Sequence, residues 1–343
     1  MITSAHNRKF PLPRILITLG DYNGVGPEVV VKALRQLKWE GRFVPIVVGN
    51  AEVWDFYVSQ LGLHAPTHRV ISCSEISEVN TICLLHCDQV KVEYLQPGQP
   101  CEAAGRASGV FLETAIACAC RGEGEAIVTA PICKNTLWAA GYHYPGQTEF
   151  LADKMDASSF AMMLIAGKFR VGFVTTHYPL REIASLLVPQ LISEKVEVVW
   201  RELKQRFKIC DPTIAIAALN PHAGEGGELG REEVEVIQPT VDRLRQKGIN
   251  IQGPFPADSL FANIEQKNFD VYMALYHDQG MIPIKMYSFG KAVNYTAGLP
   301  IPRTSPDHGT AFDIAGKKEA DESSMVEAIN LAVQLAEEGY PRS

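Results

Sequence analysis

Three histidines stand directly after apolar runs that predict buried strands. His177 ends the stretch VGFVTTH, His222 follows IAIAALNP, and His277 ends VYMALYH. The carboxyl ends of parallel strands form the edge at which open α/β sheets build their ligand sites. Neutral imidazoles bind Zn²⁺ and similar divalent ions, and three protein ligands with an open position are typical of a catalytic metal site. A hydrogen-bonded loop residue is the alternative for any one of them, so the metal-site hypothesis depends on all three together.

Two carboxylates accompany these histidines. Asp278 follows His277 directly, and Asp258 lies in the stretch PADSLF. Each is a candidate proton acceptor, and each could instead orient a liganding histidine by a hydrogen bond. The stretch YHDQGMIPIK (276–285) is therefore either a turn at a strand end or part of a reaction centre.

Four loops carry further polar residues. YPGQTEF (144–150) places Gln147 and Thr148 after a Pro–Gly turn, where a helix-capping threonine is the alternative interpretation. GDYNGVGPE (20–28) has glycines that would let backbone N–H groups approach an anion, but it lacks the GxGxxG spacing of dinucleotide sites. The glycine-rich stretch LNPHAGEGGELG and the long stretch 294–317 are predicted to be irregular, and their composition favours binding loops.

The elements that must position these residues alternate between strands and helices. Strands are predicted at 14–20, 43–50, 125–131, 169–177, 212–220 and 270–277. Helical patterns lie between them, and one has apolar residues three or four positions apart from Ile192 to Phe207. This alternation predicts an α/β fold with a largely parallel sheet covered on both faces.

Length and composition limit the class of protein. A chain of 343 residues exceeds the size at which one hydrophobic core stops growing, so two domains are expected. The net charge of −7 argues against a nucleic-acid-binding protein. No apolar run reaches the length of a membrane span, and the first residues lack a signal core, so a cytoplasmic protein is expected. The eight cysteines form no CxxC pair and are predicted to be free thiols in a reducing compartment.

The ordered motifs GDYNGVGPE, APICK, GQTEF, TTHYPLRE, LNPHAGEGG, GPFPADSLF, YHDQGMIPIK and NYTAGLPIPRTSPDHGTAFDIAG cover nearly the whole chain. Together they resemble the 4-hydroxythreonine-4-phosphate dehydrogenase family of pyridoxal phosphate biosynthesis. A narrower similarity links DHGTAFDIAGK to the isocitrate and isopropylmalate dehydrogenases, where the corresponding stretch surrounds the adenosine end of the nicotinamide cofactor.

The resemblance implies two α/β/α domains with a cleft between them, as in isocitrate and isopropylmalate dehydrogenases. Residues 1–132 with 285–343 would form the cofactor-binding domain, and 133–284 the metal, substrate and dimerisation domain. It also implies a homodimer with a shared active site, in which His277 of the partner subunit joins His177 and His222 around Zn²⁺, Mg²⁺, Mn²⁺ or Co²⁺.

The resemblance also implies roles for other residues. NAD or NADP would accept the hydride. The implied substrate contacts are Gln147, Thr148, Lys285, Asn294 and Arg303. The implied cofactor-loop residues are Asp307, His308, Gly309 and Thr310, which would otherwise be turn formers. The resemblance does not decide whether Asp278 and Asp258 act as the base or as orienting residues.

The implied reaction oxidises 4-phosphooxy-L-threonine and then decarboxylates it to 3-amino-2-oxopropyl phosphate. One residue departs from the family pattern, because Gln147 stands where the family has histidine. Glutamine forms hydrogen bonds but carries no positive charge. The alternatives are therefore a relative that oxidises 4-phospho-D-threonate, 4-phospho-D-erythronate or an aromatic cis-dihydrodiol, and a metal-binding homologue without catalysis.

Overall fold

The computed structural model describes residues 11–338, apart from residues 64, 65, 77–79, 93, 263 and 267. Most of the N-terminal stretch in which the sequence predicts no signal core lies outside the described residues. The chain divides into two compact units, Met1–Ala157 with Leu299–Ser343, and Ser158–Gly298. The boundaries expected from the resemblance fall at 132/133 and 284/285 instead.

Packing explains both differences in the boundaries. Helix α5 (Gln147–Lys154) packs against α3 (Glu102–Cys120), so it belongs to the first unit. Strand β11 (Val293–Ala297) pairs with β6 (Ala161–Ala166), so it belongs to the second unit. The consequence for function is that Gln147 shares a unit with Arg303, whereas Asn294 shares one with the histidines.

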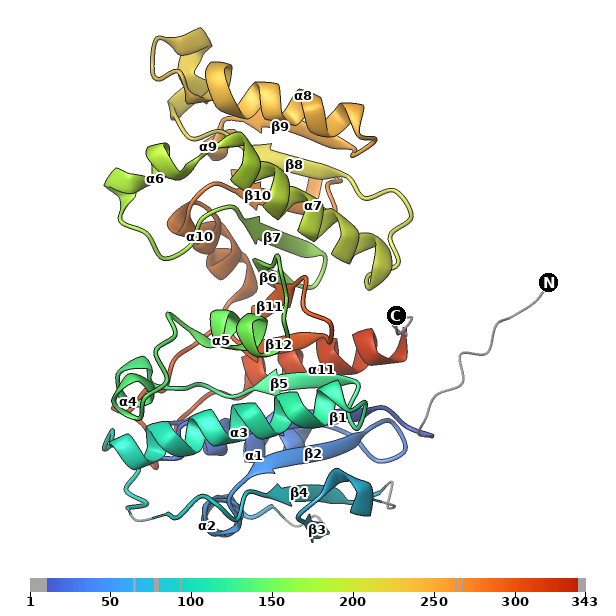
Figure 1. The fold of residues 1–343 in the computed structure, drawn as a ribbon, viewed down its shortest axis with the longest axis vertical. Coiled ribbons are helices and arrows are strands. Elements are labelled where there is room, and N and C mark those ends of the chain that lie inside the picture. The colour runs from blue at the N-terminus through green and yellow to red at the C-terminus, as the bar shows by residue number, and fades with distance from the viewer. Residues whose placement is uncertain are drawn as a thin grey trace, which may run out of the picture. The chain divides into compact units, whose positions relative to one another are not determined.

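The first unit contains a parallel sheet with the strand order β3-β4-β2-β1-β5-β12. The strands are Arg14–Thr18 (β1), Val44–Gly49 (β2), Thr67–Val70 (β3), Ile82–His86 (β4), Ala126–Thr129 (β5) and Arg303–Pro306 (β12). The helices are Gly26–Gln36 (α1), Ala51–Leu61 (α2), α3, Lys134–Ala139 (α4), α5 and Ser323–Glu337 (α11), with a short 3₁₀ turn at Cys73–Glu75. Helix α3 packs on one face of the sheet, and α1 and α11 pack together on the other (Figure 1).

The second unit has the strand order β11-β6-β7-β10-β8-β9, in which β6 runs antiparallel to both of its neighbours and the other pairs are parallel. The further strands are Phe169–Phe173 (β7), Ile214–Ala217 (β8), Ile251–Phe255 (β9) and Val271–Ala274 (β10). The helices are Leu180–Leu186 (α6), Pro189–Gln205 (α7), Gln238–Gln246 (α8), Ala257–Ala262 (α9) and His277–Ser288 (α10), with a π-helical turn at Glu233–Ile237 before α8.

Both faces of the second sheet are covered, as the sequence predicts. Successive side chains on a strand point to opposite faces. On β7, a Cβ added to Gly172 would lie near Val199 of α7, while Phe173 packs against Gly280 of α10. The predicted α/β class with a largely parallel sheet is confirmed. The α7 face is also confirmed, since Ile192, Val196, Val199 and Leu203 are fully buried, although the helix ends before Phe207.

The prediction that residues 294–317 are irregular is wrong in part. Strands β11 and β12 lie within or overlap this stretch, so Asn294 and Arg303 sit on strands. The sequence shows no apolar strand pattern at β12, because its residues are Arg, Thr, Ser and Pro. All four are nevertheless buried. Their polar groups find partners inside the protein. The hydroxyl of Thr304, for example, donates to the backbone oxygen of Ala328 in α11 at 2.8 Å.

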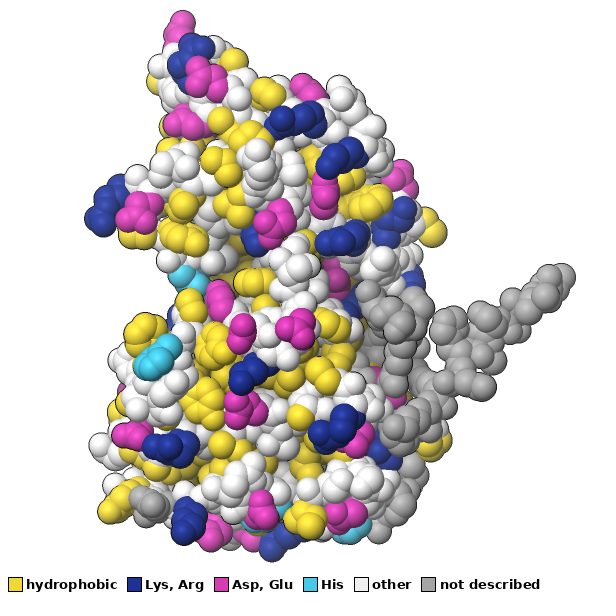
Figure 2. All heavy atoms as spheres, viewed as in Figure 1, with side chains coloured by type: hydrophobic (Ala, Val, Ile, Leu, Met, Phe, Trp, Pro, Cys, Tyr) yellow, Lys and Arg dark blue, Asp and Glu magenta, His cyan; other side chains and the backbone are white. Residues whose placement is uncertain are grey.

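The surface carries charges of both signs. Figure 2 shows acidic and basic side chains interspersed over the visible face of the described residues, without a broad basic area. In the part of the chain that the structure describes, every helix is too short or too polar to cross a lipid bilayer.

Candidate functional site

The strand order of the second unit brings the three histidine-bearing loops to neighbouring positions. Strands β7, β10 and β8 are consecutive and parallel, so their carboxyl ends meet at one edge of the sheet. His177 follows β7, His277 follows β10 and His222 follows β8. The predicted placement of all three at strand ends therefore agrees with the structure.

Two of the three imidazoles lie side by side. The ring centroids of His177 and His277 are 5.6 Å apart within the same chain. Among the described residues, the donor atoms of the three histidines do not all lie within 4.8 Å of one another. The resemblance assigns His277 to the partner's site, whereas in this single chain its ring lies beside His177.

His277 is oriented by its neighbour. It is the first residue of α10, and its Nδ1 lies 2.7 Å from Oδ1 of Asp278. A carboxylate on one ring nitrogen fixes the tautomer and directs the other nitrogen, Nε2, toward a metal. This contact gives Asp278 the geometry of an orienting residue.

Gln279 was not singled out from the sequence, yet it fixes the start of α10. Its Oε1 accepts a hydrogen bond from the backbone N–H of Leu275 at 2.6 Å, and its Nε2 donates to the backbone oxygen of Ala218 at 2.6 Å. Gln279 therefore ties together the residues that directly follow β10 and β8. In the sequence, Gln279 stands between two candidate site residues, His277 and Asp278, and a glycine. Residue propensities alone do not distinguish such a glutamine from an ordinary turn residue.

The loop of His222 has an unusual backbone. His222 and Ala223 have φ angles of 53° and 54°, which non-glycine residues rarely adopt. The carboxylate of Glu233 holds the start of the loop by accepting hydrogen bonds from the backbone N–H groups of Leu219 and Asn220, both at 2.8 Å. Such conformations persist when surrounding contacts impose them, and they are concentrated at functional sites.

Asp258 and Asp278 both line a cavity of about 720 Å³ in the second unit. Most of its wall is apolar and comes from α9 and α10, including Phe261, Ile282 and Met286. The structure thus brings the two candidate carboxylates to one cavity, and Asp278 contacts His277 there.

Lys285 and Asn294 occupy other parts of this unit. Lys285 is exposed on α10, eight residues after His277, which corresponds to about 12 Å along a helix axis. Asn294 is on β11, and its Oδ1 is buried with no hydrogen-bond partner among the described residues. A buried acceptor of this kind is expected to find a partner in a ligand or water.

The first unit holds a separate polar cluster around Arg303, which is only 2% exposed. Its Nη2 donates to Oγ1 of Thr129 at 2.6 Å and to Oε1 of Gln147 at 3.0 Å. The Nε2 of Gln147 in turn donates to the backbone oxygen of Ala130 at 3.1 Å. Residues 129, 147 and 303, distant in sequence, therefore form one guanidinium site, which we call the Arg303 cluster.

Arg303 remains a cation at neutral pH. Burial lowers the pKa of its guanidinium to about 10, and the carboxylate of Glu149 favours the charged form. A buried guanidinium is suited to a bidentate contact with phosphate or carboxylate. Thr129 was missed from the sequence, because a threonine at the end of a buried strand resembles any other β-branched residue.

Thr148 is not a helix cap. Helix α5 begins at Gln147, and its N-cap is Gly146. The interpretation of this stretch as a capping threonine is therefore wrong, because Thr148 lies inside the first turn.

The predicted cofactor loop packs against the first strand-to-helix loop. The backbone N–H of Val25 donates to the backbone oxygen of Thr310 at 2.9 Å. A Cβ on Gly24 would lie 2.9 Å from the Cβ and the backbone oxygen of Thr310, so only glycine permits this approach. Asp307 is held by Ser324, whose Oγ accepts from its backbone N–H at 2.9 Å, and the Nε2 of His308 is buried with no partner among the described residues.

A cavity of about 300 Å³ adjoins this contact, with Tyr57, Pro97, Gly316 and Lys318 among its lining residues. The loop itself depends on Asp21, which was not singled out from the sequence. The Asp21 carboxylate is fully buried and accepts hydrogen bonds from the N–H of Asn23 at 3.0 Å and the hydroxyl of Thr136 at 3.2 Å. Burial raises the pKa of Asp21.

Two covered α/β sheets with polar side chains at strand ends define an α/β enzyme that acts on a small, polar ligand. Residues 42–332 match the family described as pyridoxal phosphate biosynthetic protein PdxA. A 4-hydroxythreonine-4-phosphate dehydrogenase of Sulfurihydrogenibium sp. is 39% identical over 94% of this chain and 98% of its own length.

Solved structures agree with the sequence comparisons. The 4-hydroxythreonine-4-phosphate dehydrogenase of Klebsiella pneumoniae is 38% identical with a TM-score of 0.85, covering 94% of this chain and 99% of that one. A terephthalate 1,2-cis-dihydrodiol dehydrogenase of Burkholderia xenovorans is 28% identical with a TM-score of 0.64, covering 94% and 98%. The chain belongs to the PdxA family of pyridoxal phosphate biosynthetic proteins, and its curated relatives are dehydrogenases.

Proposed function

We propose that this protein oxidises 4-phosphooxy-L-threonine, with NAD or NADP as hydride acceptor, and that the product loses carbon dioxide to give 3-amino-2-oxopropyl phosphate. The observation that carries this proposal is the Arg303 cluster, because a buried guanidinium held by Thr129 and Gln147 suits a phosphate group. The names of the relatives support the substrate. The free state of all eight cysteines supports a cytoplasmic enzyme.

The histidines fit a divalent metal, Zn²⁺, Mg²⁺, Mn²⁺ or Co²⁺. Two imidazoles lie within contact distance, and Asp278 directs one of them. A bound ion would supply Lewis-acid chemistry, which favours loss of the proton from a substrate alcohol near neutral pH. In this proposal His177, His222 and His277 hold the metal, and Asp258 at the cavity wall is the candidate to receive the proton.

The segment Asp307, His308, Gly309 and Thr310 is proposed to bind the nicotinamide cofactor, which would supply the hydride-accepting ring. Its contact with the glycine loop at Gly24 and the adjoining cavity support this role. Lys317 and Lys318 line that cavity and would attract the cofactor's phosphates.

A homodimer with a shared active site is also proposed. Helix α10 exposes Ile282 and Met286, and Phe289 directly after its last residue is exposed as well, with 58%, 72% and 88% of their surfaces accessible. The spacing of four residues places Ile282 and Met286 on one helix face. An apolar stripe of this kind is typical of a surface that a partner covers.

The function is tested by mixing the protein with a divalent metal, NAD or NADP and one substrate at a time. We expect absorbance of the reduced nicotinamide to rise with 4-phosphooxy-L-threonine. A rise only with 4-phospho-D-threonate, 4-phospho-D-erythronate or an aromatic cis-dihydrodiol would select another substrate. The cis-dihydrodiol is included because of the Burkholderia xenovorans relative and the absence of a charge on Gln147. No rise in absorbance with any of these substrates would favour the metal-binding homologue without catalysis.

Asp278→Asn distinguishes an orienting residue from a base. If Asp278 orients His277, we expect metal affinity to fall by about 10- to 100-fold, with turnover recovered at high metal concentration. Asp258→Asn is the matched variant from the same cavity, and its loss of kcat is expected to persist at every metal concentration. Turnover is measured across a metal titration from chelated protein. A loss in Asp278→Asn that excess metal does not repair would contradict the orienting role.

A further inference from the structure

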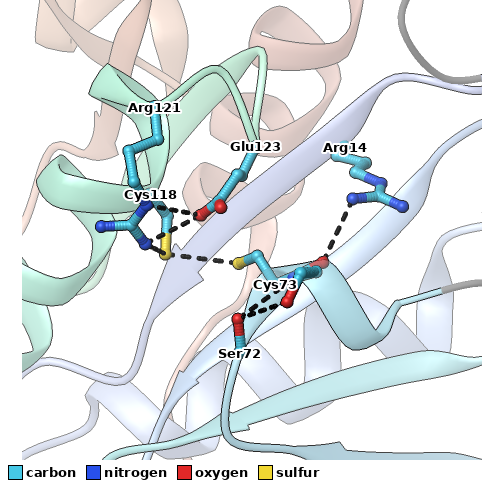
Figure 3. Close-up of polar contacts among 7 residues, drawn as sticks. Arg14, Ser72, Cys73, Cys118, Arg121 and Glu123 are labelled. Carbon is cyan, nitrogen blue, oxygen red and sulfur yellow. Dashed lines mark hydrogen bonds and ion pairs between the residues drawn. The ribbon is translucent and has the colours of Figure 1, made fainter.

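A pair of buried cysteines lies outside every site described so far. Cys73 is in the 3₁₀ turn before β4, and Cys118 is in the last turn of α3. The Sγ of Cys73 donates a hydrogen bond to the Sγ of Cys118 at 3.3 Å, although the residues are 45 positions apart (Figure 3). Both side chains are almost fully buried.

Charged groups surround the sulfur of Cys118. Nη2 of Arg121 donates to it at 3.3 Å and also to Oε2 of Glu123 at 2.8 Å (Figure 3). On the other side, Arg14 fixes the turn of Cys73 by donating to the backbone oxygens of Cys73 and Ile76, at 3.3 and 2.6 Å. The guanidinium on Cys118 favours a thiolate, which is the reactive form of cysteine.

The two thiols differ in the direction in which their pKa is shifted. The pKa of Cys118 is lowered, first by the hydrogen bond from Cys73 and further by the charge of Arg121, against the effect of burial. The pKa of Cys73 is raised because it donates that hydrogen bond and is buried. Burial raises the pKa of another buried thiol, Cys87, to about 11. The hydrogen bond from the Arg121 guanidinium to its sulfur makes Cys118 the nucleophile and Cys73 its resolving partner.

We propose that Cys73 and Cys118 are a redox-active pair that closes to a disulfide when hydrogen peroxide oxidises Cys118. The Cys118 thiolate attacks the O–O bond, which breaks, so the sulfur becomes a sulfenic acid and the second oxygen leaves as water. The Cys73 sulfur then attacks the Cys118 sulfur, the S–O bond breaks, and a second water leaves. In sum, two thiols and one hydrogen peroxide give one disulfide and two waters, with two electrons passing to the peroxide.

The geometry is close to that of the product. A disulfide needs a sulfur–sulfur distance of about 2.05 Å, so the sulfurs must approach by about 1.3 Å. The Arg121 side chain that contacts Cys118 is 57% exposed, so the pair lies close to the protein surface.

A metal site is the competing interpretation of the same atoms. Cys73, Cys118 and Glu123 place three donor atoms within 4.8 Å of one another. The guanidinium of Arg121, however, already contacts both Cys118 and Glu123. A metal cation would have to displace this positive charge, whereas disulfide formation leaves it in place.

The test is to treat the intact protein with increasing hydrogen peroxide, alkylate remaining thiols after denaturation, and analyse the peptides by mass spectrometry. We expect a peptide linking Cys73 to Cys118, which dithiothreitol separates again, at about 10-fold lower peroxide than modifies Cys87. Cys73→Ser should leave a sulfenic acid on Cys118 that dimedone captures. Cys120→Ser, which removes an exposed thiol two residues away, is the matched control and should keep the linked peptide.

Two results would overturn the proposal. One is oxidation of the exposed Cys120 and Cys210 while Cys73 and Cys118 of the wild-type chain remain open to alkylation. The other is one zinc ion per chain that survives dialysis and is lost in Cys118→Ser. The wild-type measurement does not depend on any variant folding, and it is independent of the proposed dehydrogenase activity.

Discussion

Replacing Arg303 by methionine is expected to lower kcat/KM for a phosphorylated substrate by about 10²- to 10³-fold, mainly through KM. The variant removes the buried guanidinium of the Arg303 cluster but keeps an unbranched side chain of similar length. Because apolar replacements of buried charges are often tolerated, the fold is expected to remain stable. Arg303→Lys should recover only part of the loss, since lysine lacks the planar fork that contacts two oxygens at once.

Arg206→Met is the matched control. Arg206 is also 2% exposed, but it pairs with the buried carboxylate of Glu202 at 3.1 Å. Removing it leaves that carboxylate uncompensated, at a cost of about 3–5 kcal/mol in the free energy of unfolding. Steady-state kinetics and thermal unfolding are measured for both variants. If Arg303→Met lost stability as Arg206→Met does while KM stayed constant, Arg303 would be structural rather than substrate-binding.

The second large effect concerns the histidines. His177→Ala, His222→Ala and His277→Ala are each expected to reduce turnover by at least about 10³-fold, since a catalytic metal needs three protein ligands. Metal content, measured after dialysis, should fall in all three variants. The dimer should persist, because none of these side chains belongs to the exposed stripe of α10.

Mixing inactive variants then tests whether the site is shared. If His277 of the partner subunit completes the site, reassembled mixtures of His177→Ala and His277→Ala chains contain dimers with one intact site. About a quarter of wild-type turnover is expected from random pairing in a two-fold dimer. Mixtures of His177→Ala and His222→Ala should stay inactive, because both residues would come from one chain. Recovery in neither mixture would place all three ligands in the same chain, in which the rings of His177 and His277 lie 5.6 Å apart.

Local patterns in the sequence were sufficient to place the three histidines at strand ends and to predict the fold class. Each histidine follows an apolar run, and the rule that parallel strands align their carboxyl ends places such residues at one edge. The order β7-β10-β8 could not be predicted, because it depends on pairing between residues as far apart in sequence as Val171 and Tyr272, and Ile214 and Val271.

The Arg303 cluster could be predicted from the sequence only in part. The family resemblance named Arg303 and Gln147, but nothing local indicates that their side chains meet, or that Thr129 on the neighbouring strand accepts a hydrogen bond from Arg303. Strand β12 carries no apolar pattern because its polar groups are satisfied by distant partners. For the same reason the contact between Cys73 and Cys118 is invisible in a chain whose cysteines show no paired spacing.

The glutamine at position 147 affects how the charge of the Arg303 cluster depends on pH. Its amide accepts from Arg303 and donates to Ala130 at once, and it does so without ever gaining or losing a proton. A histidine in that place would titrate near pH 6.5, and its protonated form has no lone pair to offer the guanidinium. Because the pKa of Arg303 is about 10, this cluster holds one fixed positive charge through the whole neutral range. Its attraction for an anion should therefore follow the ionisation of the anion alone.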